Sequence, residues 1–156
     1  VYARDVLGTG AGGYGALTSA FGIGAAAGAL GLAAFAARWR RRDLPLRAGW
    51  VIGGSLLVLA LTRLYPLAFL LLVAGGAALA ASAITTNTLL QTEAPEALRG
   101  RVIGVYAFIV VGLAPFGALQ AGWLAEAFGV PVAAGVSGVV TLVAVGLMSY
   151  RGVRRT

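Results

Sequence analysis

Long apolar stretches, separated by short groups of charged or helix-breaking residues, run through the whole chain. A helix that crosses a bilayer needs about 20 consecutive residues that are mostly apolar. These stretches are too long and too continuously apolar for the strands of a membrane barrel, in which apolar and polar positions alternate. The pattern therefore predicts an all-α membrane protein with five transmembrane helices, over residues 13–37, 48–64, 67–90, 102–125 and 131–150.

Arginines between the apolar stretches predict how the chain is oriented. Connections rich in Arg or Lys stay in the cytoplasm, and here the basic residues gather in alternate connections. We therefore expect the N-terminus outside and the C-terminus inside, which is also what five crossings require of the two ends. The arginines on the predicted cytoplasmic side are Arg38, Arg40, Arg41, Arg42, Arg47, Arg99, Arg101, Arg151, Arg154 and Arg155, and those on the other side are Arg4 and Arg63.

Composition supports a membrane protein and excludes several other classes. Hydrophobic residues make up 60% of the 156 residues and charged residues 11%, whereas a soluble domain carries about 25% charged residues. The net charge of +7 comes from arginines that are too sparse and too clustered to form a face for nucleic acid. The partner that we expect is the lipid bilayer, and no nucleic acid.

The residue types that most enzymes and metal sites need are absent or badly placed. The chain has no His, Cys or Lys, so it lacks the commonest general base, metal ligand and thiolate nucleophile. We expect its few acidic residues to be confined to loops. The sequence therefore predicts no catalytic residue, no metal site and no cofactor. No charge lies deep in a predicted span either, so any proton-coupling group is expected elsewhere.

Small residues form a stripe along the first predicted helix. Gly24, Gly28 and Gly31 recur at three- and four-residue spacings, with alanines close by. Such residues let a second helix approach closely. The stripe indicates either ordinary close packing or a helix that slides against a moving partner.

Amide side chains mark the third and fourth predicted helices. Asn87 and Gln91 lie four residues apart and so share a helix face. Because an unpaired amide in hydrocarbon is costly, both should face protein, water or the interface. They either join helices near the cytoplasmic surface or line a substrate path.

The fourth predicted helix contains the segment GLAPFGALQAGW, in which Pro115 should kink the helix and free a backbone carbonyl. Gly112 and Gly117 loosen the same region, and Gln120 is one of the few strongly polar groups at appreciable depth. This pattern suggests a cavity wall with a gating kink. The alternative is a packing kink, with Gln120 hydrogen-bonded to a neighbour.

The connection EAPEALRGRV should contain a short surface helix. Pro95 suits its first position, and Glu96 should pair with Arg99 at i+3. Gly100 would permit a turn into the next span, and Arg101 would mark the cytoplasmic surface.

The segment NTLLQTEAPEALRGRVIGVY, followed by PFGALQAGWLAE, resembles the stretch between the tenth and eleventh helices of major facilitator superfamily transporters. It is most similar to the bacterial drug, macrolide and siderophore exporters. The opening VYARDVLGTGAGGYGALTSAFGIGAAAGAL resembles helix eight and the external loop before it. The resemblance implies that residues 1–156 correspond to helices 8–12 of a twelve-helix fold and form part of its C-terminal half.

On this resemblance, a seventh helix and an N-terminal half complete the transporter, and the coupling carboxylates commonly lie in that half. The first, third and fourth helices here would face the central cavity, which makes Gln120, Asn87 and Thr18 the candidates for the substrate path. The Arg38–Arg42 cluster would correspond to the repeated cytoplasmic gating motif, although Asp43 follows the arginines here instead of preceding them.

The function that the resemblance implies is proton-coupled export of a small amphipathic molecule by alternating access across the bacterial inner membrane. The alternative is a non-transporting scaffold or subunit that packs against another helical membrane protein. The absence of intramembrane charge and the small-residue stripe are compatible with that alternative. A membrane enzyme is disfavoured.

Overall fold

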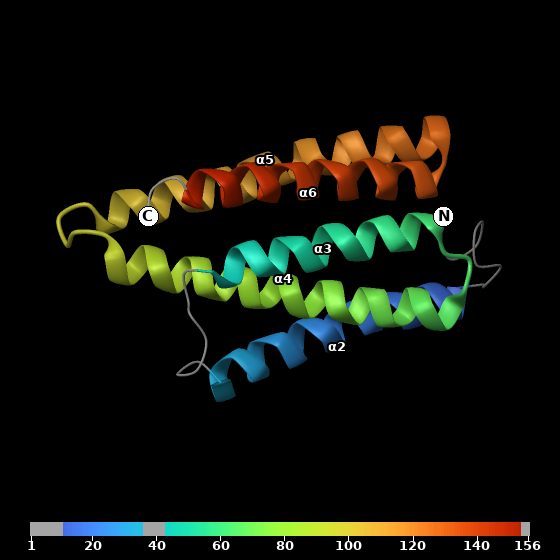
Figure 1. Cartoon of the computed structure of the whole chain (residues 1–156), viewed down its shortest axis with the longest axis horizontal. Helices are drawn as coiled ribbons and strands as arrows, with labels where there is room; N and C mark the ends of the chain where they lie inside the picture. Colours follow the sequence, from blue (N-terminus) through green and yellow to red (C-terminus); the bar gives the residue numbers. More distant parts are fainter. Residues whose placement is uncertain (1–10, 36–42, 154–156) are drawn as a thin grey trace.

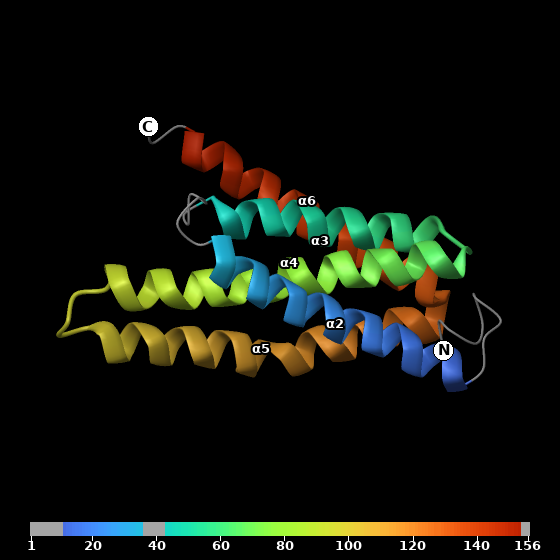
Figure 2. The same cartoon turned by 90° about the horizontal axis from the view of Figure 1, so that it is seen from below.

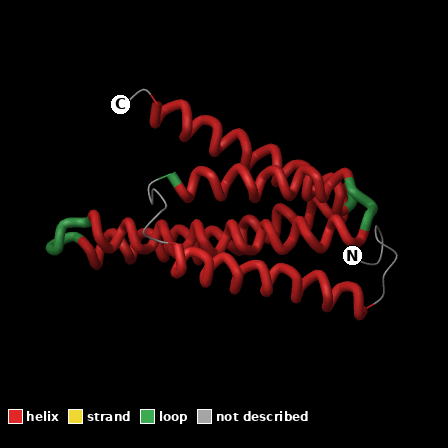
Figure 3. The backbone as a smooth tube through the Cα atoms, turned by 60° about the horizontal axis from the view of Figure 1, so that its bottom comes forward, coloured by secondary structure: helices red, strands yellow, loops and turns green. Residues whose placement is uncertain are grey.

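The computed structural model describes residues 11–35 and 43–153. Within them the chain is helical and contains no strand (Figure 3), which confirms the predicted all-α fold. The five described helices are each long and apolar enough to cross a membrane. They are α2 (Ala11–Phe35), α3 (Leu44–Leu61), α4 (Tyr65–Glu93), α5 (Arg99–Phe128) and α6 (Val130–Val153).

Helix α3 begins at Leu44, before the predicted residue 48, so that Arg47 lies in its first turn and not in the connection. Pro45 stands at the start of the helix, where its missing N–H is not needed. The connection to α4 is short, and in it the Thr62 hydroxyl accepts a hydrogen bond from the Leu64 N–H at 3.2 Å. Helices α3 and α4 therefore form the tight antiparallel pair drawn in Figure 1.

The connection between α4 and α5 contains no surface helix, so that prediction was wrong. Helix α4 continues to Glu93, and the residues that follow form a turn in which the Leu98 N–H donates to the Pro95 carbonyl at 2.9 Å. Gly100 lies inside α5 and not in the turn. A turn takes the place of the expected helix, because α4 and α5 both extend into the segment and leave too few residues between them for another helix.

The helices lie side by side, with α4 between α2 and α3 (Figures 1 and 2). Helix α2 runs parallel to α4, since Gly24 faces Val73 and Gly28 faces Ala77. Helix α6 packs on α3, and α5 packs mainly on α6. The Tyr65 hydroxyl donates to the Gly13 carbonyl at 3.5 Å, which ties the beginnings of α2 and α4 together at one end of the molecule.

Small residues make up much of the buried interior. Ala20 and Ala68 are fully buried, and Leu17 and Leu59 are nearly so. Among the described residues no large side chain is completely buried. Helix packing in a bilayer gains little from hydrophobicity, since lipid tails are as apolar as leucine, and close backbone approach supplies the attraction instead. A core of this kind fits a membrane protein.

Helix α5 differs from the other described helices, because it contains no buried residue. Its large apolar side chains face outward, and Phe108 is 78% exposed. Gly129, with φ of 87°, ends α5 and allows α6 to start almost at once. The backbone at this position lies in the region that favours glycine.

Candidate functional site

The three candidates for the substrate path lie on three different helices. Thr18 is on α2, Asn87 on α4 and Gln120 on α5. Thr18 and Gln120 are exposed on the described structure, and Asn87 is half-buried. The side chains therefore occur on the helices that the resemblance assigns to the cavity, but none of the three is enclosed by the described helices.

These candidates do not form one cluster. Thr18 lies two turns from the beginning of α2, and Gln120 about two turns from the end of α5, so both are near the end of the molecule where α4 begins. Asn87 lies near the other end of α4. Because Gly24 lies level with Val73, Thr18 lies level with the first turns of α4, and at 1.5 Å per residue Asn87 is roughly 30 Å from it along the helix axis. A path that used all three would run along the bundle.

Helix α5 continues through Pro115 without a break, with Gly112 and Gly117 on either side. Neither glycine is crowded, and the nearest group to a Cβ built on Gly112 is the Phe108 ring at 3.9 Å. A hollow beside Pro115 is lined by α5 alone. The loosened region therefore faces open space on the described structure.

The hollow on α5 contains a carboxylate that the sequence interpretation missed. Glu126 lines it together with Trp123, because α5 runs to Phe128 and not to residue 125. The expectation that acidic residues are confined to loops was therefore wrong. The useful signal was the segment WLAEAF, in which Glu126 follows Trp123 by three residues and so shares its helix face. The Trp123 and Phe128 rings pack edge to face, 6.0 Å apart.

Two of the hydroxyl groups near the end of α4 donate hydrogen bonds within the helix itself. The Thr88 hydroxyl donates to the Ile84 carbonyl and the Thr92 hydroxyl to the Thr88 carbonyl, each at 2.9 Å. Thr85 differs, because its side chain is 2% exposed and its oxygen is buried without a hydrogen-bond partner. The sequence interpretation chose the amides in this segment and overlooked Thr85, since one threonine among several gives no distinguishing pattern.

Two of the three glycines in the α2 stripe lie directly against α4. A Cβ added at Gly24 would collide with the Val73 backbone, whose Cα lies 2.8 Å away, and one at Gly28 would collide with the Ala77 backbone. A Cβ at Gly31 would meet open space. From the other side, Gly76 of α4 lies against the Phe21 carbonyl of α2. The stripe is thus in contact with a helix of this same chain.

The connection between α4 and α5 carries the residues of the predicted cytoplasmic motif on its surface. Pro95 and Glu96 are exposed in the turn, and Arg99, Gly100 and Arg101 are exposed in the first turn of α5. This end of the molecule therefore presents two guanidinium groups to its surroundings. Across residues 11–35 and 43–153, no group of three or more acidic, His or Cys side chains could hold a metal ion.

Comparison with known proteins gives two matches. A family described as transmembrane secretion effector, within the major facilitator superfamily, matches residues 1–155. The multidrug efflux pump Tap of Mycolicibacterium fortuitum is 36% identical over 89 residues, which cover 57% of this chain and 22% of the pump. The matched part is thus less than a quarter of that relative's length. No solved structure matches.

Proposed function

We propose a function from the family of this protein: the chain belongs to the transmembrane secretion effector family of major facilitator transporters. It is part of a multi-pass membrane exporter in the bacterial inner membrane. The exporter moves a small amphipathic molecule out of the cell by alternating access and is driven by protons. This chain supplies five helices of the C-terminal half, those that resemble helices 8–12 of the twelve-helix fold.

Family membership over nearly the whole chain carries this proposal. The name of the similar protein, a multidrug efflux pump, supports export of drug-like molecules. The described structure is compatible with such a role, because α5 has no buried residue and exposes large apolar side chains. An exposed apolar face of this size suits either lipid or further helices, and a seventh helix and an N-terminal half would cover part of it.

The polar groups that could contact a substrate are few. Gln120 and Glu126 on α5, Thr18 on α2 and Asn87 on α4 stand among apolar side chains. Binding sites for small molecules commonly combine apolar walls with a small number of polar groups. The proposal assigns Gln120 to the cavity wall and treats Pro115 with its neighbouring glycines as the point where α5 bends during the transport cycle.

The test is an efflux measurement with the complete reading frame that contains this chain. Expressed in a bacterial strain that lacks its own multidrug pumps, it should lower the steady-state accumulation of ethidium, an amphipathic fluorescent cation. Collapse of the whole proton-motive force with the protonophore carbonyl cyanide m-chlorophenylhydrazone should restore accumulation to the level of cells with an empty vector. Equal accumulation with and without the protein would contradict export of this substrate class, and efflux that survives the protonophore would contradict proton coupling.

The alternative function, a scaffold or subunit without transport, is less well supported by the structure. The small-residue stripe that was compatible with it is used inside the chain, in the contact of α2 with α4. The reading frame separates the two functions. A continuous upstream frame that encodes about seven more apolar spans supports the transporter, and a start codon directly before Val1 supports the subunit.

A further inference from the structure

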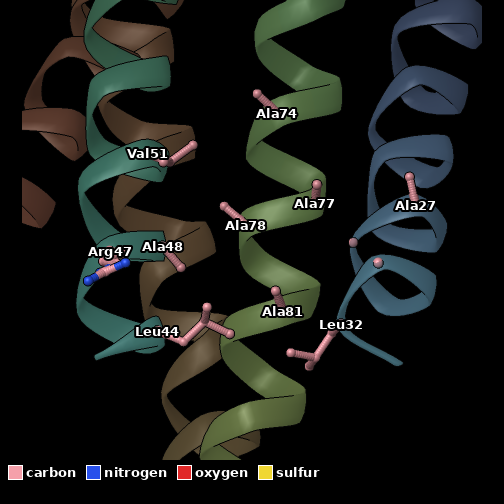
Figure 4. Close-up of a pocket in the computed structure, with 12 residues that line it drawn as sticks. Ala27, Leu32, Leu44, Arg47, Ala48, Val51, Ala74, Ala77, Ala78 and Ala81 are labelled. Carbon is pink, nitrogen blue, oxygen red and sulfur yellow. The ribbon is translucent and has the colours of Figure 1, made fainter. Parts of the chain in front are cut away.

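A groove opens on α4 between α2 and α3, with a volume of about 430 Å³. Its floor is formed by four alanines of α4, Ala74, Ala77, Ala78 and Ala81. In Figure 4, Ala74 and Ala78 point from α4 toward α3, and Val51 points back from α3. The short alanine side chains leave the space between the two outer helices unfilled.

The groove lies near one end of the molecule. Its walls come from the last turns of α2 and the first turns of α3, and the arginine distribution predicts that this end is cytoplasmic. No residue of α5 or α6 lines it. The contact between α3 and α6 uses another face of α3, where Gly49 and Gly53 meet Val145 and Leu142. The groove is therefore on the outer side of the layer formed by α2, α4 and α3.

Among the described residues that line the groove, one is charged. Arg47, in the first turn of α3, lines it and is exposed. Within the described part of the chain, the structure gives its guanidinium no carboxylate partner. A long basic side chain near a helix end can keep its charge at the membrane surface while its stem lies along apolar groups. The described lining thus combines an apolar floor with the Arg47 cation at the predicted cytoplasmic end.

We propose that this groove binds an anionic phospholipid of the cytoplasmic leaflet, with one acyl chain along the alanine floor and the phosphate at Arg47. A guanidinium pairs well with phosphate oxygens, and the cytoplasmic leaflet is the one rich in anionic lipid. The alanine floor offers no hydrogen-bond group and suits a hydrocarbon chain. Charge and shape together therefore favour a lipid over a polar solute.

The lipid proposal is tested on the purified 156-residue chain in mixed micelles with equal amounts of phosphatidylglycerol and phosphatidylcholine of matched acyl chains. Native mass spectrometry measures how much of each lipid the chain retains. We expect about a fivefold preference for phosphatidylglycerol, as one arginine near an anionic surface gives. Arg47→Gln should reduce this preference to about one, and Ala74→Leu, which adds a side chain to the groove, should lower the retention of both lipids.

Two matched variants are the controls. Arg63→Gln removes an exposed arginine at the opposite end, and Ala83→Leu enlarges an exposed alanine of α4 outside the groove. Both should retain lipid like the unchanged chain. Equal retention of the two lipids by the unchanged chain would overturn the proposal, as would a preference that survives Arg47→Gln. A dimer that Ala74→Leu dissociates would instead identify a second copy as the occupant.

Discussion

At the scale of single residues, glycines decide how closely α2 and α4 approach. Gly24 and Gly28 place the α2 backbone against the Val73 and Ala77 backbones of α4, and Gly76 does the same from the opposite side. The atoms nearest to these positions belong to the backbone, which cannot rotate away as a side chain could. Even one added methyl group must therefore push the two helices apart.

We expect Gly28→Ala to lower the free energy of unfolding by about 1–3 kcal/mol, the usual cost of overpacking. Gly22→Ala is the matched control, because a Cβ at Gly22 meets nothing within 4 Å. It should leave stability unchanged or raise it by up to about 1 kcal/mol, since alanine favours helix more than glycine. Unfolding by sodium dodecyl sulfate in mixed micelles, followed by circular dichroism, measures both. Equal effects of the two variants would contradict the packing role of Gly28.

Gln120 gives a second prediction at this scale, made for the complete transporter. Gln120→Leu should reduce ethidium efflux or change the range of exported compounds while insertion into the membrane is preserved, because it removes an amide from the proposed cavity wall. The control is Ser137→Ala on α6, whose hydroxyl already donates to the Ala133 carbonyl at 2.8 Å. Unchanged resistance profiles at equal expression would argue against Gln120 as a cavity residue.

At the scale of helices, α5 differs from the other four. Leu59 of α3 is buried to 9% exposure beside Leu17 and Ala68, whereas α5 has no buried residue and Phe116 is 68% exposed. Apolar side chains that face lipid in both the folded and the separated states contribute little to the association of helices. Most of the stability of this chain should therefore come from α2, α3, α4 and α6.

This difference predicts that truncating a side chain on α3 lowers the free energy of unfolding more than truncating one on α5. Leu59→Ala should cost about 1–3 kcal/mol of unfolding free energy, below the usual range for a leucine in a soluble core because lipid replaces water in the separated state. Phe116→Ala should cost less than about 0.5 kcal/mol, as for other surface changes, although it removes the larger side chain. Titration with sodium dodecyl sulfate compares them, and a larger loss for Phe116→Ala would show that α5 is packed.

At the scale of the whole molecule, the helix ends define two faces. One end contains the beginnings of α2, α4 and α6, and the other contains the turn between α4 and α5 with Arg99 and Arg101 (Figure 2). The second face is predicted to be cytoplasmic, because basic connections are retained there. The orientation also decides which leaflet meets the groove at Arg47.

Single cysteines test this orientation, since the chain has none of its own. Ala97→Cys, in the turn after α4, should react with a membrane-impermeant maleimide only after the cells are opened. Ala127→Cys, near the end of α5, should react in intact cells. Both alanines are exposed in the structure. The reverse labelling pattern would contradict the predicted orientation.

Much of the fold was predictable, and the limits of prediction have specific causes. The five helices follow from apolar length alone, and they agree with the structure. Helix ends were less predictable. Arg47 is charged and yet lies in the first turn of α3. Glu126 is charged and yet lies on α5, where it lines the hollow. Charged residues mark where a helix leaves the hydrocarbon, whereas the helix itself continues into the interface. The proposed site residues Gln120, Asn87 and Thr18 remain predictions.

The sequence by itself determined the number of helices, their approximate spans, the expected orientation and the family resemblance. These properties depend on apolar length, on the distribution of arginines and on local motifs, all of which are written along the chain. Only the tertiary structure decided that the stripe of Gly24 and Gly28 faces α4, and that a groove with Arg47 remains between α2 and α3. The physical reason is that these helices are apolar on all sides. Hydrophobicity therefore does not identify the face that packs, and the close approach of two backbones decides it instead.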